Sequence, residues 1–287
     1  MKVLRTVADV RAAVSAWRNS GARIGLVPTM GALHEGHLSL VMGAGQACDH
    51  VVVSLFVNPT QFGPSEDYAV YPRDEERDAQ KLRALGVDVV FAPTVEEMYP
   101  KGFATSVKVR GLTERLCGAV RPVHFEGVAT VVTKLLLQVM PDAAFFGEKD
   151  YQQLQVIRRL VRDLDIPVHI VGLPTVRESD GLALSSRNTF LSASERAAAP
   201  ALHRTLAQTA ARLLCRARPG EQTIGEELTR ARDALSSAGF TRIDYLELCD
   251  AETLAPAADL ARPARLLAAV WLGRTRLIDN EPVGPRP

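Results

Sequence analysis

The stretch VPTMGALHEGHLSLV, residues 27–41, decides how the rest of the chain is interpreted. It starts as an apolar strand pattern and ends as a helix pattern, with glycines and two histidines at the change. In an open α/β sheet, ligands bind where a strand ends and a loop leads into a helix N-terminus. The unpaired N–H groups and positive dipole end of that helix favour an anion. The stretch therefore predicts a phosphate site and a helix that begins near Gly36.

His34 and His37 are candidate phosphate donors. An imidazole can donate from one ring nitrogen while a backbone group holds the other. The stretch lacks both the glycine spacing of a dinucleotide fingerprint and the G-K-[ST] of a P-loop, so side chains must supply some contacts. Three other interpretations stay open: one histidine caps the helix, the pair binds a metal, or both are merely solvated. Metal binding is disfavoured because the order is H-E-G-H rather than H-E-x-x-H.

Outward from this stretch, short apolar runs alternate with amphipathic ones. The apolar runs are RIGLV (23–27), HVVVSLFV (50–57), VDVVFAP (87–93), AAFFG (143–147) and VHIVGLPTVR (168–177). Such alternation is typical of β-α-β units around a parallel sheet. We therefore predict an α/β fold with a doubly wound parallel sheet of five strands, covered by helices on both faces. The charged N-terminal segment, residues 1–21, is expected to be helical.

The pattern changes after residue 175. Alanine- and arginine-rich helical stretches are followed by two strand-like runs, RIDYLELC (242–249) and RLLAAVWLG (265–273). We expect one domain over residues 1–175 and a second, smaller α+β domain over residues 176–287.

Composition narrows the class of partner. The 287 residues include 34 Lys and Arg against 33 Asp and Glu, so no basic field attracts nucleic acid or anionic lipid. The four cysteines lack C-x-x-C spacing, as is usual for reduced cytosolic thiols. No apolar run approaches the roughly 18 residues of a membrane span. We expect a cytoplasmic protein with small-molecule substrates and no nucleic acid or membrane partner.

The motif P-T-M-G-x-L-H-x-G-H after a first strand resembles the nucleotide-binding motif of the pantothenate synthetase family, the pantoate–β-alanine ligases. The resemblance runs through nearly the whole chain, in the order SLFVNPTQF, DYAVYPRD, RPVHFEGVATVVTKL, FGEKDYQQLQVIRRLV, RESDGLALSSRN and AAVWLGRTRLIDN. Several independent motifs in one order are far more specific than a lone H-x-G-H. One departure is Val123, which stands where the family usually has glycine.

This resemblance implies a two-step ligation. The carboxylate of pantoate attacks the α-phosphorus of ATP to give pantoyl adenylate and pyrophosphate, and the amine of β-alanine then displaces AMP. ATP is a substrate and Mg²⁺ accompanies it. The family fold is a Rossmann-like domain with a smaller C-terminal domain that can close as a lid, and family members are typically homodimers.

The resemblance also implies the site residues. Because negative charge accumulates on the α-phosphate and on departing pyrophosphate, the chemistry needs several preorganised donors or cations. His37, His34, Lys149 and Arg187 are the expected catalytic residues, and Gln61 and Gln153 the expected pantoate contacts. ATP binding is expected from Pro28, Thr29, Met30, Gly31, Ala32, Leu33, His34, Glu35, Gly36, His37, Gly147, Glu148, Lys149, Asp150, Val176, Leu184, Ser185, Ser186 and Arg187. No metal-ligating residue is expected.

Plainer interpretations of these residues stay open. Lys149 fits a solvated lysine at a helix start, although a cation opposes the dipole there and so suggests an anionic ligand. Asp150 fits a helix N-cap equally well. Surface glutamines such as Gln61 and Gln153 are common. Another nucleotidyltransferase is the alternative enzyme, a nucleotide-binding sensor without turnover is the alternative from another class, and a tRNA-charging enzyme is disfavoured because no basic extension follows.

Overall fold

The protein is described by a computed structural model that covers residues 1–64, 68–215 and 220–284 of the chain. The chain forms two compact units. The first consists of Met1–Glu148 and Gln153–Pro174, and the second of Lys149–Gln152 and Thr175–Pro287. The four residues Lys149–Gln152 thus group with the second unit although the chain on either side of them groups with the first.

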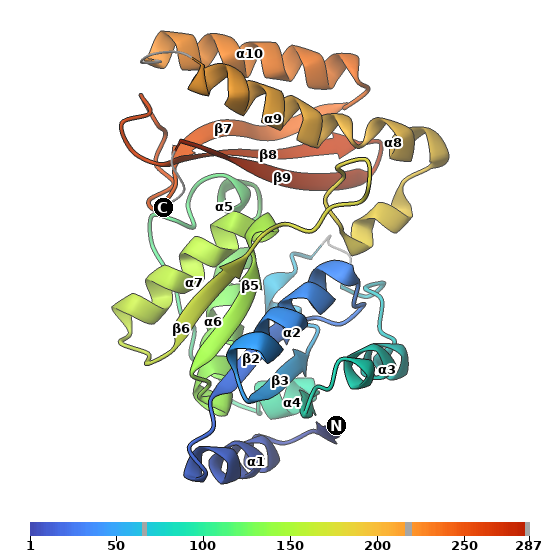
Figure 1. Ribbon diagram of the computed structural model, residues 1–287, viewed down its shortest axis with the longest axis vertical. Helices are drawn as coiled ribbons and strands as arrows, with labels where there is room; N and C mark the ends of the chain where they lie inside the picture. The colour runs from blue at the N-terminus through green and yellow to red at the C-terminus, as the bar shows by residue number, and fades with distance from the viewer. Residues whose placement is uncertain (65–67, 216–219, 285–287) are drawn as a thin grey trace. The chain divides into compact units, whose positions relative to one another are not determined.

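The first unit contains a parallel sheet whose strand order is β1-β4-β3-β2-β5-β6 (Figure 1). This arrangement confirms the predicted α/β fold with a doubly wound, Rossmann-like sheet. Chain order runs outward in one direction from β2 to β3 and in the other direction from β5 to β6, so β2 and β5 flank the switch point of the sheet. The strands are β1 (Lys2–Leu4), β2 (Ile24–Thr29), β3 (His50–Leu55), β4 (Val89–Phe91), β5 (Ala143–Gly147) and β6 (His169–Leu173).

The edge strand β1 corrects the expectation that the whole N-terminal segment is helical. Lys2 pairs with Val89 and Leu4 with Phe91, which adds a sixth strand to the predicted five. The helix begins only at Val7, after Thr6 caps it by accepting from the backbone N–H of Asp9. A three-residue strand is too short to show alternation in the sequence.

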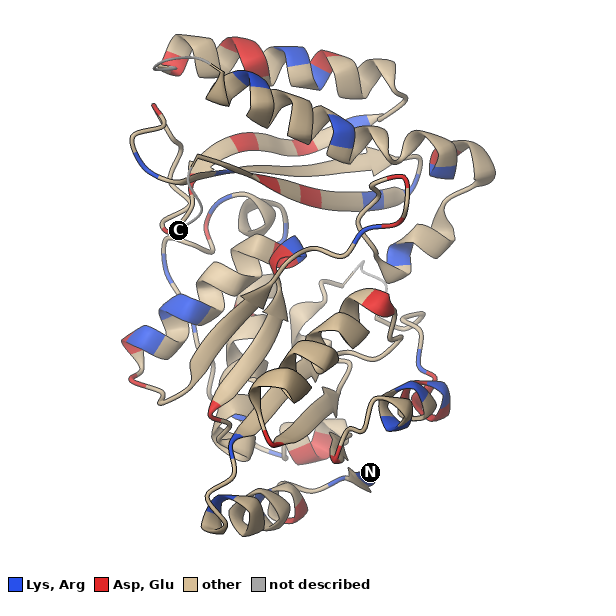
Figure 2. Cartoon of the chain, viewed as in Figure 1, with Lys and Arg blue, Asp and Glu red and all other residues tan. Residues whose placement is uncertain are grey.

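Helices cover this sheet because its strands are apolar on both faces, as parallel strands are. Val27, Val53, Val90 and Phe145 are fully buried members of one core cluster. Strands β2 to β6 contain no Asp, Glu, Lys or Arg, whereas the acidic and basic residues of this unit lie on helices, on loops and on the edge strand β1 (Figure 2). The first unit contains α1 (Val7–Asn19), α2 (Glu35–Ala47), α3 (Glu75–Ala84), α4 (Val95–Met98), α5 (Cys117–Val120), α6 (His124–Val139), most of α7 (Tyr151–Asp163) and the 3-10 turn η1 (Pro59–Gln61), and the turn η2 (Glu148–Asp150) follows β5.

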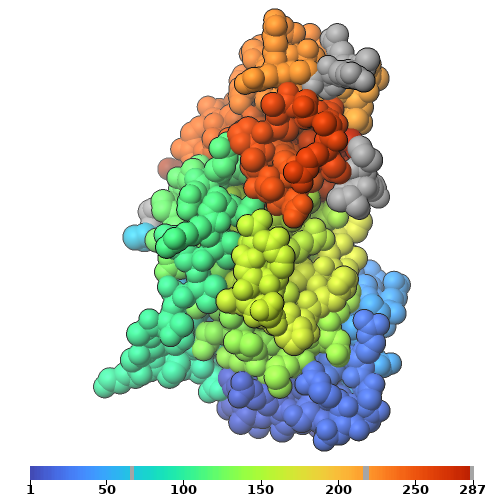
Figure 3. Space-filling model, turned by 90° about the vertical axis from the view of Figure 1, so that its left-hand side faces the viewer, coloured from blue at the N-terminus to red at the C-terminus, as the bar shows by residue number. Residues whose placement is uncertain are grey.

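The connection after α4 lies on the surface, where residues 101–106 are exposed (Figure 3). It is tied to α6 at two places. The backbone N–H of Val107 donates to the hydroxyl of Thr130 at 2.9 Å, and the ammonium of Lys134 lies 4.8 Å from the centre of the Phe103 ring. A segment without regular structure is therefore held by hydrogen bonding and cation–π contact.

The second unit is an antiparallel sheet in the order β7-β8-β9, with α9 and α10 along one face (Figure 1). The side chains of Leu266 and Val270 on β8 face those helices and share a core with Leu202 and Leu206 of α9. The elements are β7 (Arg242–Asp250), β8 (Ala264–Leu272), β9 (Thr275–Val283), η3 (Ser186–Phe190), α8 (Ala193–Ala198), α9 (Ala201–Leu214) and α10 (Glu221–Ser237). Among the described helices of both units, none has the length and apolar character to cross a membrane.

Candidate active site

Three of the sequence motifs follow neighbouring strands of the first unit. The H-x-G-H loop follows β2, the NPTQ turn follows β3, and the G-E-K-D segment begins at the end of β5. Strand β2 pairs with β3 on one side and with β5 on the other, all in parallel. Because carboxyl ends of parallel strands meet at one edge, the fold brings these motifs to the switch point where ligands bind in such sheets.

The two histidines cap the helix that they begin. His34 is the N-cap of α2, and its Nδ1 accepts from the backbone N–H of Gly36 at 3.1 Å. Nδ1 of His37 accepts in turn from the backbone N–H of His34 at 3.4 Å, and the ring centres are 4.1 Å apart. The capping interpretation, left open for one histidine, is thus realised in both as a reciprocal capping box.

Capping fixes the tautomer of both rings. A nitrogen that accepts a hydrogen bond carries no proton, so the neutral forms of His34 and His37 hold their ring proton on Nε2. Each ring therefore presents an N–H donor on the side away from its cap. Capping and phosphate binding use different nitrogens and do not exclude one another.

The loop before the histidines has an unusual backbone that a distant carboxylate supports. Gly31 and the non-glycine Ala32 both have positive φ, 82° and 52°. Asp78 of α3, 3% exposed, accepts from the backbone N–H groups of Ala32 and Leu33, each at 2.8 Å. The ammonium of Lys81 donates to the carbonyl of Leu33. Helix α3 thus holds the left-handed turn in place from outside the motif.

Gln61 is buried rather than a surface amide. It ends the turn η1, where its Nε2 donates to the sulfur of Met30 at 3.0 Å and its Oε1 accepts from Nδ2 of Asn58 at 3.1 Å. The same Asn58 donates to the carbonyl of Gly127 and accepts from the hydroxyl of Tyr99 at 2.8 Å. Burial raises the pKa of the Tyr99 hydroxyl, although its hydrogen bond with Thr60 acts in the opposite direction. The hydroxyl therefore keeps its proton and donates. Asn58 therefore fixes the orientation of Gln61.

The start of α6 lies close against η1. A Cβ on Gly127 would lie 2.4 Å from the carbonyl oxygen of Thr60, so only glycine fits there. Nδ1 of His124 lies 3.0 Å from the carbonyl oxygen of Gln61. Val123, the departure from the family pattern, has φ −90° and is 53% exposed. That conformation is open to any residue, so the valine is accommodated without backbone strain.

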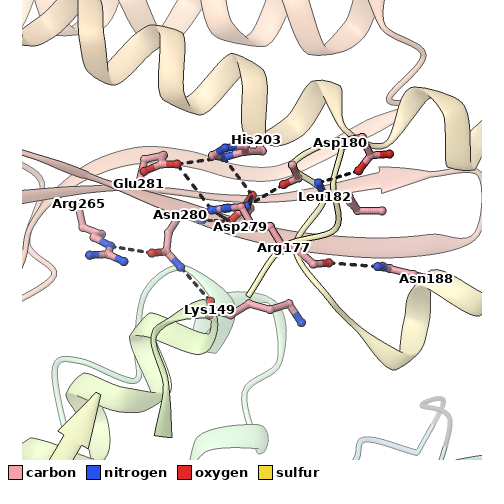
Figure 4. A network of polar contacts seen from close by, with 12 residues as sticks. Lys149, Arg177, Asp180, Leu182, Asn188, His203, Arg265, Asp279, Asn280 and Glu281 are labelled. Carbon is pink, nitrogen blue, oxygen red and sulfur yellow. Dashed lines mark hydrogen bonds and ion pairs between the residues drawn. The ribbon is translucent and has the colours of Figure 1, made fainter. Parts of the chain in front are cut away.

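Gly147 ends β5, and apart from its two chain neighbours no heavy atom of the described residues lies within 4 Å of a Cβ built there. Glu148 and Gln153 are partly buried. Between them in the chain, the carbonyl of Lys149 accepts from Nδ2 of Asn280 at 2.9 Å, while no described side chain is hydrogen-bonded to the Lys149 ammonium. Figure 4 shows that ammonium pointing away from the polar network. Asp150 is exposed.

The S-S-R-N segment of the second unit follows a small hairpin. Leu184 donates its N–H to the carbonyl of Val176 at 3.0 Å, so these two expected ATP contacts are neighbours. Ser185 caps η3 by accepting from the N–H of Arg187 at 3.3 Å, and Ser186 follows it at the start of η3. Each of these residues is partly buried.

Charged side chains outside that segment hold the hairpin. Arg177 makes a bidentate pair with Asp279, at 2.6 and 3.0 Å, and donates to the carbonyl of Gly181 (Figure 4). Arg196 of α8 binds both Glu178 and Asp180 at 2.6 Å. The Arg196 guanidinium beside Asp180 holds the pKa of that carboxyl below its usual value.

A protein-held metal has little support in the described residues, which contain no group of three or more His, Cys, Asp or Glu placed to hold an ion. The H-x-x-H metal interpretation therefore lacks a third ligand there.

Sequence reasoning missed the residues that position the site. Asp78 and Arg177 look like solvated charges in the sequence, and Gly127 looks like an ordinary helix glycine. Asn58, Gly127, Arg177 and Asp279 do stand inside the motifs SLFVNPTQF, RPVHFEGVATVVTKL, RESDGLALSSRN and AAVWLGRTRLIDN, which was the one available signal, whereas Asp78 stands in none of them.

Comparison with known proteins agrees with this geometry over nearly the full chain. The family model described as Pantoate-beta-alanine ligase matches residues 2–282. A pantothenate synthetase of Chelativorans sp. is 58% identical over 98% of this chain and 97% of that protein. One of Paramagnetospirillum magneticum is also 58% identical, over 99% of this chain and 98% of its own length.

Solved structures give the same result. A pantothenate synthetase from Thermus thermophilus superposes with a TM-score of 0.91 at 51% identity, over 99% of this chain and 100% of that one. A pantoate-beta-alanine ligase from Francisella tularensis, complexed with beta-gamma ATP and beta-alanine, gives 0.79 at 35% identity, over 98% and 97% of the two chains.

Proposed function

The chain belongs to the pantoate-beta-alanine ligase family, and from this premise we propose that it makes pantothenate in two steps through a pantoyl adenylate. In the first step the carboxylate of pantoate attacks the α-phosphorus of ATP and pyrophosphate leaves. In the second step the amine of β-alanine attacks the acyl carbon, AMP leaves, and the amine loses a proton. Adenylation is needed because an oxygen of a free carboxylate is a poor leaving group.

One observation carries the phosphate part of this proposal. The H-x-G-H pair binds its own helix through Nδ1 of both rings, which places the ring proton of each on Nε2. Two oriented N–H donors and a helix N-terminus then act on the same anion. His34 and His37 are proposed to stabilise the negative charge that grows on the α-phosphate during adenylation.

Lys149 and Arg187 are proposed to stabilise the rest of the phosphate chain and the departing pyrophosphate. Lys149 has a partly buried side chain whose ammonium no described side chain neutralises. Arg187 follows the Ser185 cap, and the Ser185 and Ser186 hydroxyls add donors beside it. Catalysis of this kind is mostly positioning and electrostatics, so several aligned cations suit turnover better than mere binding.

Gln61 and Gln153 are proposed to bind pantoate, which presents two hydroxyls and a carboxylate. A neutral amide can donate and accept at once without protonating the carboxylate. Gln61 suits this role because Asn58 and Met30 hold its orientation. The remaining ATP contacts and the lid role of residues 176–287 stay predictions.

Mg²⁺ is proposed to arrive with ATP. The described residues offer no cluster of three or more ligating side chains, which suits an ion held mainly by phosphate oxygens and water. When bound it neutralises phosphate charge. We also expect a cytoplasmic homodimer, which a measurement of mass in solution would test.

The experiment that tests the function is product analysis. The purified protein is incubated with ATP, Mg²⁺, pantoate and β-alanine, and pantothenate, AMP and pyrophosphate are quantified. We expect equal amounts of all three products, and none when pantoate is omitted. A dinucleotide product would indicate another nucleotidyltransferase, and bound ATP without any product would indicate a sensor.

A further inference from the structure

The RLIDN end of the last motif, residues 276–280, has no part in the chemistry above, yet its last two residues make polar contacts with two separate segments of the second unit. Asp279 and Asn280 are consecutive on β9 and each is 3% exposed. Consecutive residues of a strand point to opposite faces of the sheet. Their side chains therefore reach two different segments of the chain (Figure 4).

On one face, Asp279 holds the hairpin that precedes Arg187. Its two carboxylate oxygens accept from both terminal nitrogens of Arg177. Arg177 lies opposite Ala183 in the hairpin and also binds the carbonyl of Gly181. The pair therefore fixes the strand from which Ser185 and Arg187 continue.

On the other face, Asn280 holds the backbone at Lys149. Its Nδ2 donates to the Lys149 carbonyl at 2.9 Å, while its Oδ1 accepts from Nε of Arg265 at 2.6 Å. The Arg265 guanidinium lies over the ring of Tyr151, 4.3 Å from its centre. The two strand residues are also joined, because the N–H of Asn280 donates to Oδ1 of Asp279 at 2.8 Å.

We propose that Asp279 and Asn280 are positioning residues for adenylation, which set the places of Arg187 and Lys149 relative to each other from one rigid strand. The proposal rests on the proposed phosphate roles of Lys149 and Arg187. A buried ion pair often contributes no more to stability than well-packed apolar residues of similar volume would, so stability alone does not account for these buried polar groups, and we assign them a role in fixing geometry. Two cations on loops need such a frame, since a misplacement of about 1 Å can cost roughly 100-fold in rate.

The test is a set of double-mutant cycles on single-turnover adenylation, measured with ATP, Mg²⁺ and pantoate per folded molecule. N280D removes the donor to the Lys149 carbonyl and keeps the acceptor for Arg265. We expect N280D to slow adenylation about 10- to 100-fold and K149A about 100- to 1,000-fold. In the K149A background N280D should add less than about 3-fold, because nothing is left to position.

A second cycle pairs D279N with R187A. Combining each positioning variant with the other cation's variant then tests whether each positioning residue acts on one cation only. N280D should keep its full effect in the R187A background, and D279N should keep its full effect in the K149A background. The matched control is I278V, because Ile278 lies on the same face of β9 as Asn280. This change lowers the free energy of unfolding by about 1 kcal/mol and leaves the hydrogen bonds of Asp279 and Asn280 in place, so the adenylation rate should stay within about 2-fold.

The outcomes separate the two levels of the proposal. Wild-type rates in N280D and D279N, or effects that multiply fully in every background, overturn the positioning roles and leave the proposed function standing. A wild-type rate in K149A or R187A instead overturns the phosphate role of that cation, and the positioning role built on it falls as well.

Discussion

The two regions that carry the proposed phosphate contacts are positioned in different ways. His34 and His37 bind backbone groups two and three residues away, inside their own motif. Lys149 and the hairpin before Arg187 are held by Asn280 and Asp279, which lie 131 and 102 residues further along the chain. A short motif can thus specify its own geometry when its residues cap a helix, whereas a loop needs a frame from elsewhere in the fold.

The largest expected effect tests whether the first region has two separable functions. His34→Asn keeps an N-cap acceptor, because asparagine is a preferred N-cap, but it removes the imidazole Nε2 donor. His37→Gln likewise keeps a capping-box acceptor at the third helical position. We expect each variant to slow single-turnover adenylation about 100- to 1,000-fold with little change in Tm.

The alanine variants are the matched comparison. His34→Ala and His37→Ala lose the cap as well as the donor, so they should show the same rate loss and an additional loss of about 1 kcal/mol in the free energy of unfolding. Adenylation at the wild-type rate in the asparagine and glutamine variants would show that the histidines only cap the helix and take no part in the reaction.

The next prediction tests whether the first region is positioned only by contacts within its own motif. Asp78 lies 45 and 46 residues from the two N–H groups that it binds. Asp78→Asn can accept at only one position and places an amide donor against the other N–H. We expect a loss of about 1–3 kcal/mol in the free energy of unfolding, measured by chemical denaturation. We also expect adenylation to be slower by about 10-fold or more, measured by rapid quench.

Glu76→Gln on the same helix is the control, because Glu76 is exposed and should change stability by no more than about 0.5 kcal/mol. If Asp78→Asn behaves like Glu76→Gln, the left-handed turn does not depend on Asp78, and contacts within the motif are sufficient to position the first region.

A smaller effect concerns pantoate rather than phosphate. Gln61→Ala and Gln153→Ala remove amides proposed to hydrogen-bond pantoate, and we expect pantoate affinity to fall roughly 10-fold in each. ATP affinity should stay within error, as should both affinities in the exposed control Gln80→Ala. Isothermal titration measures all of these, and unchanged pantoate affinity in both variants refutes the assignment.

The sequence predicted site residues in both regions, but it missed the long-range contacts that position them. The H-x-G-H stretch shows its glycines, its histidines and its place after a strand within a few residues, and the apolar alternation predicted the parallel sheet. The pairing of Arg177 with Asp279 joins two charges that each look solvated in the sequence. The strand Lys2–Leu4 was missed because three residues carry no periodicity.

The smallest effect concerns a part of the second unit without a proposed substrate contact. Burial raises the pKa of Asp244, but hydrogen bonds from Arg276 and Trp271 and the charges of Arg276 and Arg242 outweigh it, so the pKa is lowered from 3.8. A lowered folded-state pKa gives stability that is present above the unfolded value and is lost as pH falls through the folded one. The Tm difference between wild type and Asp244→Asn should therefore be largest near neutral pH and shrink below about pH 4.

Adenylation per folded molecule should be unchanged in Asp244→Asn. A Tm difference that is independent of pH would show that the carboxylate charge contributes nothing there.

Both regions are proposed to serve one step, the formation of an adenylate before the amine reacts. The most direct test is the exchange of labelled pyrophosphate into ATP with pantoate and Mg²⁺ present and β-alanine absent. We expect exchange that requires pantoate and proceeds without β-alanine, because pyrophosphate leaves in the first step. Exchange that appears only after β-alanine is added would contradict a separate adenylation step and point to a concerted reaction.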